Sequence, residues 1–183
     1  MNWVSTLFIL LAAFLAVFWQ AAFDGFRWLT GAQLDLLPAI MVYAALTGSI
    51  LQVVLLAALG GTWLDCLSAN PLGLSVLPLF AVGFAVHLAR ELILKEETVA
   101  QFTFGLIASA LTPLLTLVLL LTVGYSPLLG WGTLWQWLVM SLVGAVATPL
   151  WFGVFEWLHR TFAHARATTS SFRPDREIRR GRI

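Results

Sequence analysis

Gly60-Gly61-Thr62-Trp63-Leu64-Asp65-Cys66-Leu67-Ser68-Ala69-Asn70-Pro71-Leu72-Gly73-Leu74 joins two long apolar segments through one short turn. Asp65 closes a nearly unbroken apolar run, and Asn70-Pro71-Leu72-Gly73 has the composition of a tight turn. An acidic side chain at the end of a membrane-length apolar segment raises the free energy unless it reaches water, a partner or a backbone donor. The stretch therefore predicts a corner of fixed geometry between two helices.

Composition places the chain among integral membrane proteins. Of its 183 residues, 60% are hydrophobic and only 10% are charged, whereas soluble domains have about 25% charged residues. No Asp, Glu, Lys or Arg occurs in residues 1–23, 36–64, 66–89 or 98–155. A membrane-spanning helix needs about 20 consecutive, mostly apolar residues, and each of these four segments is at least that long. A single cysteine, Cys66, excludes an internal disulfide framework.

The apolar segments predict an all-α polytopic membrane protein, a bundle of about six transmembrane helices. One helix across residues 36–64 would rise about 43 Å, well beyond a hydrocarbon core of about 30 Å, so a break is expected at Thr47-Gly48-Ser49. The short helix before this break is expected to tilt little, to thin the bilayer locally, or to be buried among its neighbours as a half-span. The predicted helices cover residues 3–23, 34–46, 50–67, 74–94, 99–123 and 134–158.

Basic residues predict the orientation, because short cytoplasmic loops are enriched in Lys and Arg. Residues 1–160 are expected to form one transmembrane domain, and residues 161–183 a flexible, Arg-rich cytoplasmic tail that associates with anionic lipid or docks a filament. Six spans put Arg90 and Lys95 on the same side as this tail, whereas five spans would put the amino terminus outside. Seven of the ten basic residues lie near the carboxyl terminus: Arg160, Arg166, Arg173, Arg176, Arg179, Arg180 and Arg182.

Asp65 has two interpretations in this topology. It falls near the outer end of its helix, close to water, with the Asn70-Pro71-Leu72-Gly73 turn facing the exterior. One interpretation is that its carboxylate accepts hydrogen bonds from the amides of the turn that opens the next helix. The other is a docking or ligand contact. Asp65, Asn70, Pro71 and Gly73 are therefore candidates for a structural or partner-contact role.

A second polar group stands at the far end of the helix that follows. His87, Arg90 and Glu91 are spaced i, i+3 and i+4, which puts them on one helix face where it leaves the membrane. The face either holds a snorkelling Arg90 paired locally with Glu91, or docks a cytoplasmic or membrane partner. The same arrangement recurs near the end of the last helix, at Glu156, His159 and Arg160.

Residues that catalysis would require are not apparent. The chain has no Gly-x-Ser-x-Gly element, and His159 and His164 have no convincing third partner for a metal. We therefore expect no catalytic residues, no metal and no cofactor, and we expect no nucleic acid as a partner. Small residues at four-residue spacing, Gly105 with Ser109 and Ser141 with Ala145, predict close helix packing.

Residues 34–94 resemble the rod-shape-determining protein MreD family. The resemblance covers Leu37-Pro38, Tyr43, Asp65, Leu67-Ser68 and Pro71-Leu72-Gly73-Leu74, and chain length and short loops agree with it. It implies a non-catalytic inner-membrane subunit of the bacterial rod (elongation) complex, which regulates peptidoglycan synthesis and cell shape. The implied partners are MreC, RodA with its penicillin-binding transpeptidase, the MreB filament and membrane lipids.

A rival interpretation comes from the same resemblance. The helix arrangement of the MreD family is similar to that of the substrate-binding subunits of energy-coupling-factor vitamin transporters. A transporter subunit of this kind would hold a small ligand in its outward-facing half. The residues expected to converge there are Asp65, Asn70, Asp24, Arg27 and Asp35. The Arg-rich tail is longer and more basic than the family pattern requires, so its role is not carried over.

Overall fold

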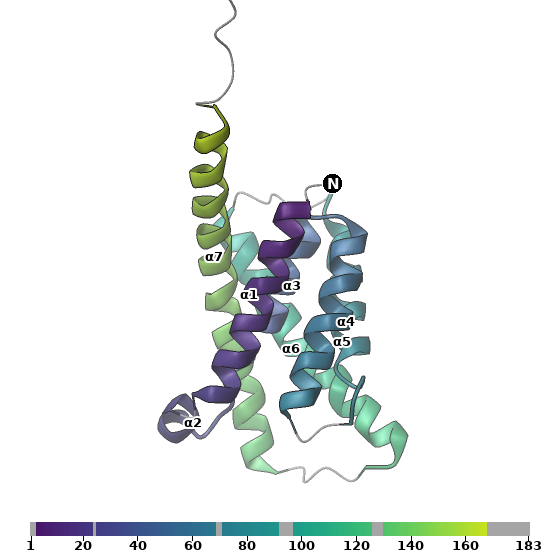
Figure 1. Cartoon of the computed structure of the whole chain (residues 1–183). Helices are drawn as coiled ribbons and strands as arrows, with labels where there is room; N and C mark the ends of the chain where they lie inside the picture. Colours follow the sequence, from purple (N-terminus) through teal and green to yellow (C-terminus); the bar gives the residue numbers. More distant parts are fainter. Residues whose placement is uncertain (1–2, 24, 69–70, 92–96, 126–129, 168–183) are drawn as a thin grey trace, which may run out of the picture. The chain divides into compact units, whose positions relative to one another are not determined.

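The computed structural model describes residues 3–23, 25–68, 71–91, 97–125 and 130–167. It divides into two compact units, Met1–Phe152 and Gly153–Ile183, whereas the sequence predicted a boundary after residue 160. Within the first unit, α1, α4 and α6 run in one direction, and the shorter helices α3 and α5 run back between them (Figure 1). The described residues form seven α-helices: α1 (Trp3–Ala22), α2 (Gly25–Thr30), α3 (Leu37–Thr47), α4 (Ile50–Leu67), α5 (Val76–Ala89), α6 (Thr98–Val123) and α7 (Trp131–Ala167).

Four segments are long and apolar enough to cross a membrane, which confirms an all-α, multi-pass membrane protein. They are Trp3–Ala22, Ile50–Leu67, Thr98–Val123 and Trp131–Thr161. The other two predicted spans are short. Helix α3 has 11 residues and α5 has 14, and they rise about 17 Å and about 21 Å. Neither length reaches the bilayer's hydrocarbon thickness of about 30 Å, so four long spans are shown, and a bundle of about six transmembrane helices stays a prediction.

Helix α3 is the centre of the first unit. It contacts α1, α4, α5 and α6, and every residue from Leu37 to Leu46 is buried. A helix that is apolar on all sides is stable only where protein or lipid surrounds it completely. Of the three possibilities open for this short segment, burial among its neighbours is the one that the structure shows.

Local hydrogen bonds determine where α3 begins. Pro38 stands in its first turn, where a missing amide proton has no cost. Asp35 Oδ1 accepts a hydrogen bond from Leu37 N at 3.1 Å. With the amide of Gln20 oriented to suit its neighbours, Nε2 donates to Leu34 O at 3.2 Å and Oε1 accepts from Leu36 N at 2.8 Å. Helix α1 thus fixes the segment that leads into α3.

The end of α3 is fixed as well. The helix ends at Thr47 and α4 begins at Ile50, which confirms the predicted break at residues 47–49. Gln52 Oε1 accepts a hydrogen bond from Ser49 N at 2.9 Å, and Gln52 Nε2 donates to Thr6 Oγ1 at 2.8 Å. Gln52, whose side chain caps the first turn of α4, is therefore also hydrogen-bonded to α1.

Small residues bring α6 close to the first part of α7. A Cβ atom at Gly105 would overlap the side chain of Thr148, and one at Gly144 would overlap the side chain of Ser109. Such interfaces let helix backbones approach where lipid gives no hydrophobic driving force. The packing role predicted for Gly105 and Ser109 is confirmed.

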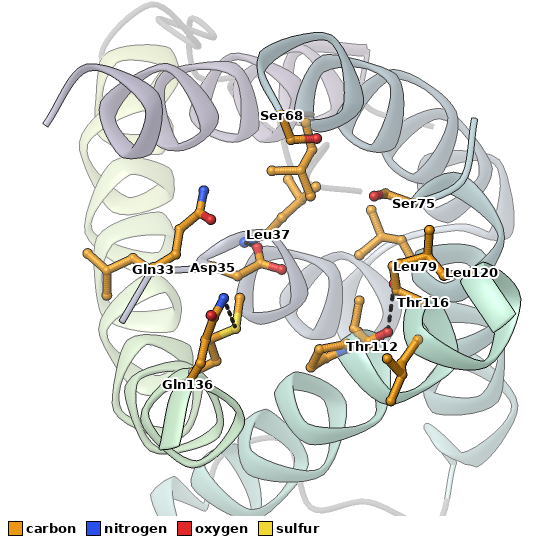
Figure 2. A pocket seen from close by; sticks show the side chains of 15 residues that line it. Gln33, Asp35, Leu37, Ser68, Ser75, Leu79, Thr112, Thr116, Leu120 and Gln136 are labelled. Atoms are coloured by element: carbon orange, nitrogen blue, oxygen red, sulfur yellow. Dashed lines mark hydrogen bonds between the residues drawn. The ribbon is translucent and has the colours of Figure 1, made fainter. Parts of the chain in front are cut away.

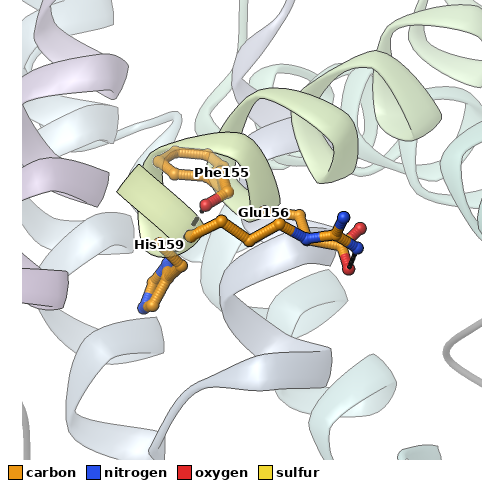
Figure 3. Close-up of polar contacts among 4 residues, drawn as sticks. Phe155, Glu156 and His159 are labelled. Carbon is orange, nitrogen blue, oxygen red and sulfur yellow. Dashed lines mark hydrogen bonds and ion pairs between the residues drawn. The ribbon is translucent and has the colours of Figure 1, made fainter. Parts of the chain in front are cut away.

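The described part of the second unit is the end of α7. Arg160 Nη2 donates to Glu156 Oε1 at 2.8 Å, and His159 Nδ1 lies 3.1 Å from Phe155 O (Figure 3). The ion pair is exposed and joins residues one helical turn apart, so its contribution to stability is small, about 0.3–0.5 kcal/mol. Residues 168–183 of the predicted tail lie outside the described residues.

Candidate functional site

The Asp65 carboxylate closes the corner between α4 and α5. Oδ2 accepts hydrogen bonds from Gly73 N at 2.8 Å and Ser75 N at 3.1 Å, and Oδ1 lies 3.3 Å from Ser75 N. Gly73 has φ +89°, a left-handed conformation that side chains with a Cβ atom rarely adopt. The predicted hydrogen bonds from the turn amides to the Asp65 carboxylate are thus confirmed.

The corner is more deeply buried than its position in the sequence suggested. Asp65 is 2% exposed, which corrects the expectation that it lies close to water. The helices approach closely here, because a Cβ atom on Gly61 would lie 2.8 Å from Val76 Cα. Both carboxylate oxygens face backbone amides of the chain's own turn. Exposed Gly73 and half-buried Pro71 are therefore the predicted contact residues of this corner that a partner can reach. Asn70 lies outside the described residues.

The polar group at the end of α5 does not form one surface. His87 Nδ1 lies 2.9 Å from Ala45 O, which requires the proton on Nδ1 because a carbonyl oxygen only accepts. Arg90 Nη1 donates to Gly48 O at 3.3 Å. Both side chains therefore satisfy carbonyls at the end of α3, which have no partner within their own helix.

This arrangement corrects the expected local pairing of Arg90 with Glu91. Among the described residues the ion pair is the one between Glu156 and Arg160, and Arg90 is bonded to the α3 terminus instead. Glu91 is exposed. Of the three predicted contact candidates at this end, Glu91 is the one whose side chain faces outward.

A partly open cavity of about 210 Å³ lies beside the end of α4 and the start of α5, and Figure 2 shows the side chains that line it. The last turn of α4, the first turns of α5, the second half of α6 and the first turns of α7 surround it. Leucine side chains form most of its apolar wall. Besides Asp35, its polar lining consists of Gln33, Ser68, Ser75, Thr112, Thr116 and Gln136.

The cavity follows from the shortness of α3. The first residue of that helix, Leu37, lines the cavity, and residues 33–35 line it from the segment before the helix. A helix of 11 residues cannot fill the central position along the whole length of its 18-residue neighbour α4 and 26-residue neighbour α6. The remainder is occupied by a non-helical segment and by the cavity.

Asp35 is the acidic residue of this cavity. It lies between α2 and α3, outside the four candidate spans, and it is 8% exposed. Burial raises the pKa of the Asp35 carboxyl to about 6, while the hydrogen bond from Leu37 N acts in the opposite direction. The group is therefore mostly ionised at neutral pH, in a site where its desolvation is unfavourable.

The ligand site of the rival interpretation is assembled only in part. Asp35 lines the cavity, but Asp65 is directed to its own turn and does not line it. Asn70 and Asp24 lie outside the described residues, as does the side chain of Arg27. The sequence placed Asp35 in an interfacial loop. The signal for its burial was an acid standing just before a wholly apolar helix with proline in its first turn.

Comparison of the chain with protein-family models, with curated proteins and with solved structures finds no match.

Proposed function

We propose that the protein is a non-catalytic, multi-pass subunit of the bacterial inner membrane that assembles with the wall-synthesis proteins of the rod complex. It resembles the MreD family over residues 34–94. In this proposal its partners are MreC, RodA with its transpeptidase, and the MreB filament, and its carboxyl terminus is cytoplasmic. Its contribution is to bind and position these proteins.

The observation that carries this proposal is the use of polar groups in the segment that resembles the family. Residues 34–94 include α3, α4 and α5, and these three helices contact one another. Asp65 joins α4 to the start of α5, while His87 and Arg90 join the end of α5 to the end of α3. These groups fix the relative positions of α3, α4 and α5, which we call the three-helix frame. Because they are used to hold the frame, they support a role in which the protein's surface binds other proteins.

A transporter subunit is the second candidate, and the cavity is the observation that favours it. Its volume is about 210 Å³, below the roughly 300–1,000 Å³ of sites that enclose drug-sized ligands. A vitamin-sized substrate therefore needs more room than the cavity offers. For this reason we favour assembly over vitamin transport.

Two exposed residues at opposite ends of the frame provide the test. Leu72 is 73% exposed in the turn after α4, and Glu91 is exposed after α5. Neither side chain takes part in the hydrogen bonds that hold the frame. With the proposed orientation, Leu72 faces the periplasmic domain of MreC and Glu91 faces the cytoplasm.

Leu72→Glu should lower recovery of MreC with the affinity-tagged protein several-fold, and Glu91→Lys should lower recovery of cytoplasmic MreB instead. Each variant is the control for the other, and membrane levels of the tagged protein should be unchanged in both. Arg90 is unsuitable for this purpose because its loss would also weaken α3. Unchanged recovery of both partners in both variants would argue against the proposal.

A further inference from the structure

We propose that the cavity beside α3 binds a small organic amine in its protonated form, with the Asp35 carboxylate as the counter-ion. The site goes beyond the proposed assembly function and does not depend on it. Three features of the cavity support this assignment: the charge of Asp35, the hydrogen-bonding character of the neighbouring side chains, and the size of the cavity.

Asp35 provides a negative charge without a described positive partner. Its Oδ1 accepts one hydrogen bond, from Leu37 N at 3.1 Å, and the side chain is 8% exposed. Among the described residues no basic side chain forms an ion pair with it. A buried carboxylate is unfavourable unless it is paired and hydrogen-bonded, so a ligand that brings a positive charge into the cavity gains stabilisation there.

The threonine hydroxyls of the wall favour a hydrogen-bond donor as the ligand. Thr112 Oγ1 donates to Ala108 O at 2.8 Å, and Thr116 Oγ1 donates to Thr112 O at 2.9 Å. Each hydroxyl has one hydrogen, so both oxygens present only lone pairs to a molecule in the cavity. An ammonium group has three N–H donors and no acceptor, which matches a wall made of a carboxylate and hydroxyl lone pairs.

Gln136 adds to the same character. One N–H of its Nε2 is directed toward Met140 Sδ at 3.9 Å, and its Oε1 supplies an acceptor beside the second N–H (Figure 2). The acceptor atoms therefore come from three separate places in the fold: the segment before α3, the second half of α6 and the first turns of α7. Their convergence is a tertiary feature that does not arise from one helix alone.

Size and apolar lining limit the rest of the ligand. The cavity measures about 210 Å³, and a protein cavity of about 150 Å³ holds one benzene molecule. Leu37, Leu79 and Leu117 supply apolar walls. The space therefore suits a primary amine with one ring or a short alkyl chain. Benzylamine has these properties and serves as the probe.

The test compares benzylamine with benzyl alcohol, which has nearly the same shape and no charge. The full chain is purified in zwitterionic lipid nanodiscs, and binding is measured by titration calorimetry at pH 7.5. Benzylamine should bind saturably and at least tenfold more tightly than benzyl alcohol. Asp35→Asn should remove this preference, whereas Glu156→Gln, which removes an equally negative but exposed carboxylate, should keep it.

A second variant covers the case in which Asp35→Asn does not fold. Thr116→Val keeps the shape of the side chain and removes its acceptor, so it should weaken benzylamine binding several-fold and benzyl alcohol binding less, because the alcohol has one donor and the ammonium has three. Absence of saturable benzylamine binding by the unmodified protein would overturn the proposal. Equal affinities for the two probes, or equal benzylamine affinities of the Asp35→Asn and unmodified proteins, would overturn it as well.

Discussion

Asp65 and Asp35 are both buried acids, but their surroundings differ. Asp65 faces the amides of Gly73 and Ser75, which replace the water that the carboxylate loses on burial. Asp35 has one amide, that of Leu37, and otherwise faces the cavity. The first acid therefore stabilises a corner of the fold, whereas the second lowers the stability of the folded protein when it is ionised.

Substitutions at the corner should rank by what they do to the backbone. Asp65→Asn keeps one acceptor oxygen for the amides of Gly73 and Ser75, so it should cost less than about 1 kcal/mol. Gly73→Val places a β-branched residue at φ +89° and should lower stability by about 1–3 kcal/mol. The cost is backbone strain alone, since no atom lies within 4 Å of the added Cβ atom.

The free energies of unfolding are measured in mixed micelles with increasing dodecyl sulfate, followed by tryptophan fluorescence. Leu72→Val is the matched control, because it introduces valine at the preceding residue, whose side chain is exposed. It should change stability by no more than about 0.5 kcal/mol. A larger loss in Asp65→Asn than in Gly73→Val would contradict this account of the corner.

The raised pKa of Asp35 predicts a pH dependence of stability. Its carboxyl has a pKa of about 6 in the folded protein against 3.8 in the unfolded chain, so the folded state binds the proton more tightly. Protonation of Asp35 therefore adds to the stability of the folded protein. This stabilisation is greatest below pH 3.8 and is lost as the pH rises through 6. The shift corresponds to a loss of up to about 3 kcal/mol. Unfolding of the unmodified protein and of Asp35→Asn is compared across this range, and parallel curves would refute the assignment.

At the scale of elements, α3 determines how the other helices are placed. It is held at its start by Gln20 of α1 and at its end by His87 and Arg90 of α5. Because α3 is short and enclosed, its termini lie where their unpaired backbone groups need partners from other helices.

The α6–α7 interface gives a prediction at this scale. Gly144→Val should destabilise the protein by about 1–3 kcal/mol, because its side chain would overlap that of Ser109 in a tightly packed contact. The measurement is the same unfolding titration. Gly132→Val is the control on the same helix, since nothing lies within 4 Å of a Cβ atom there. Equal stabilities of the two variants would show that the close approach of α6 and α7 is not required.

The elements were predictable from the sequence to different degrees. The break at residues 47–49 and the corner after Asp65 depend on glycine, serine and proline chemistry within a few residues, so local reasoning found both. The lengths of α3 and α5 depend on which carbonyls other helices can satisfy. The role of Arg90 was missed for the same reason: its partner, Gly48, is 42 residues away. The cavity at Asp35 likewise results from the packing of five helices.

At the scale of the whole molecule, the exposed surface is mainly apolar. Large hydrophobic side chains of α1, α6 and α7 are exposed, among them Phe18, Leu114 and Leu142. In a multi-pass membrane protein such faces meet lipid or the helices of another membrane protein. The proposed function assigns part of this surface to the proteins of wall synthesis, while the cavity is a separate feature of the interior.

Purification of the affinity-tagged full-length protein from its native membranes, with quantitative mass spectrometry of what accompanies it, tests the assembly function most directly. An unrelated tagged multi-pass protein at the same membrane level is the control. The proposal predicts that MreC and RodA are enriched over this control. Enrichment of an ATPase pair without MreC or RodA, or of none of these proteins, would contradict it.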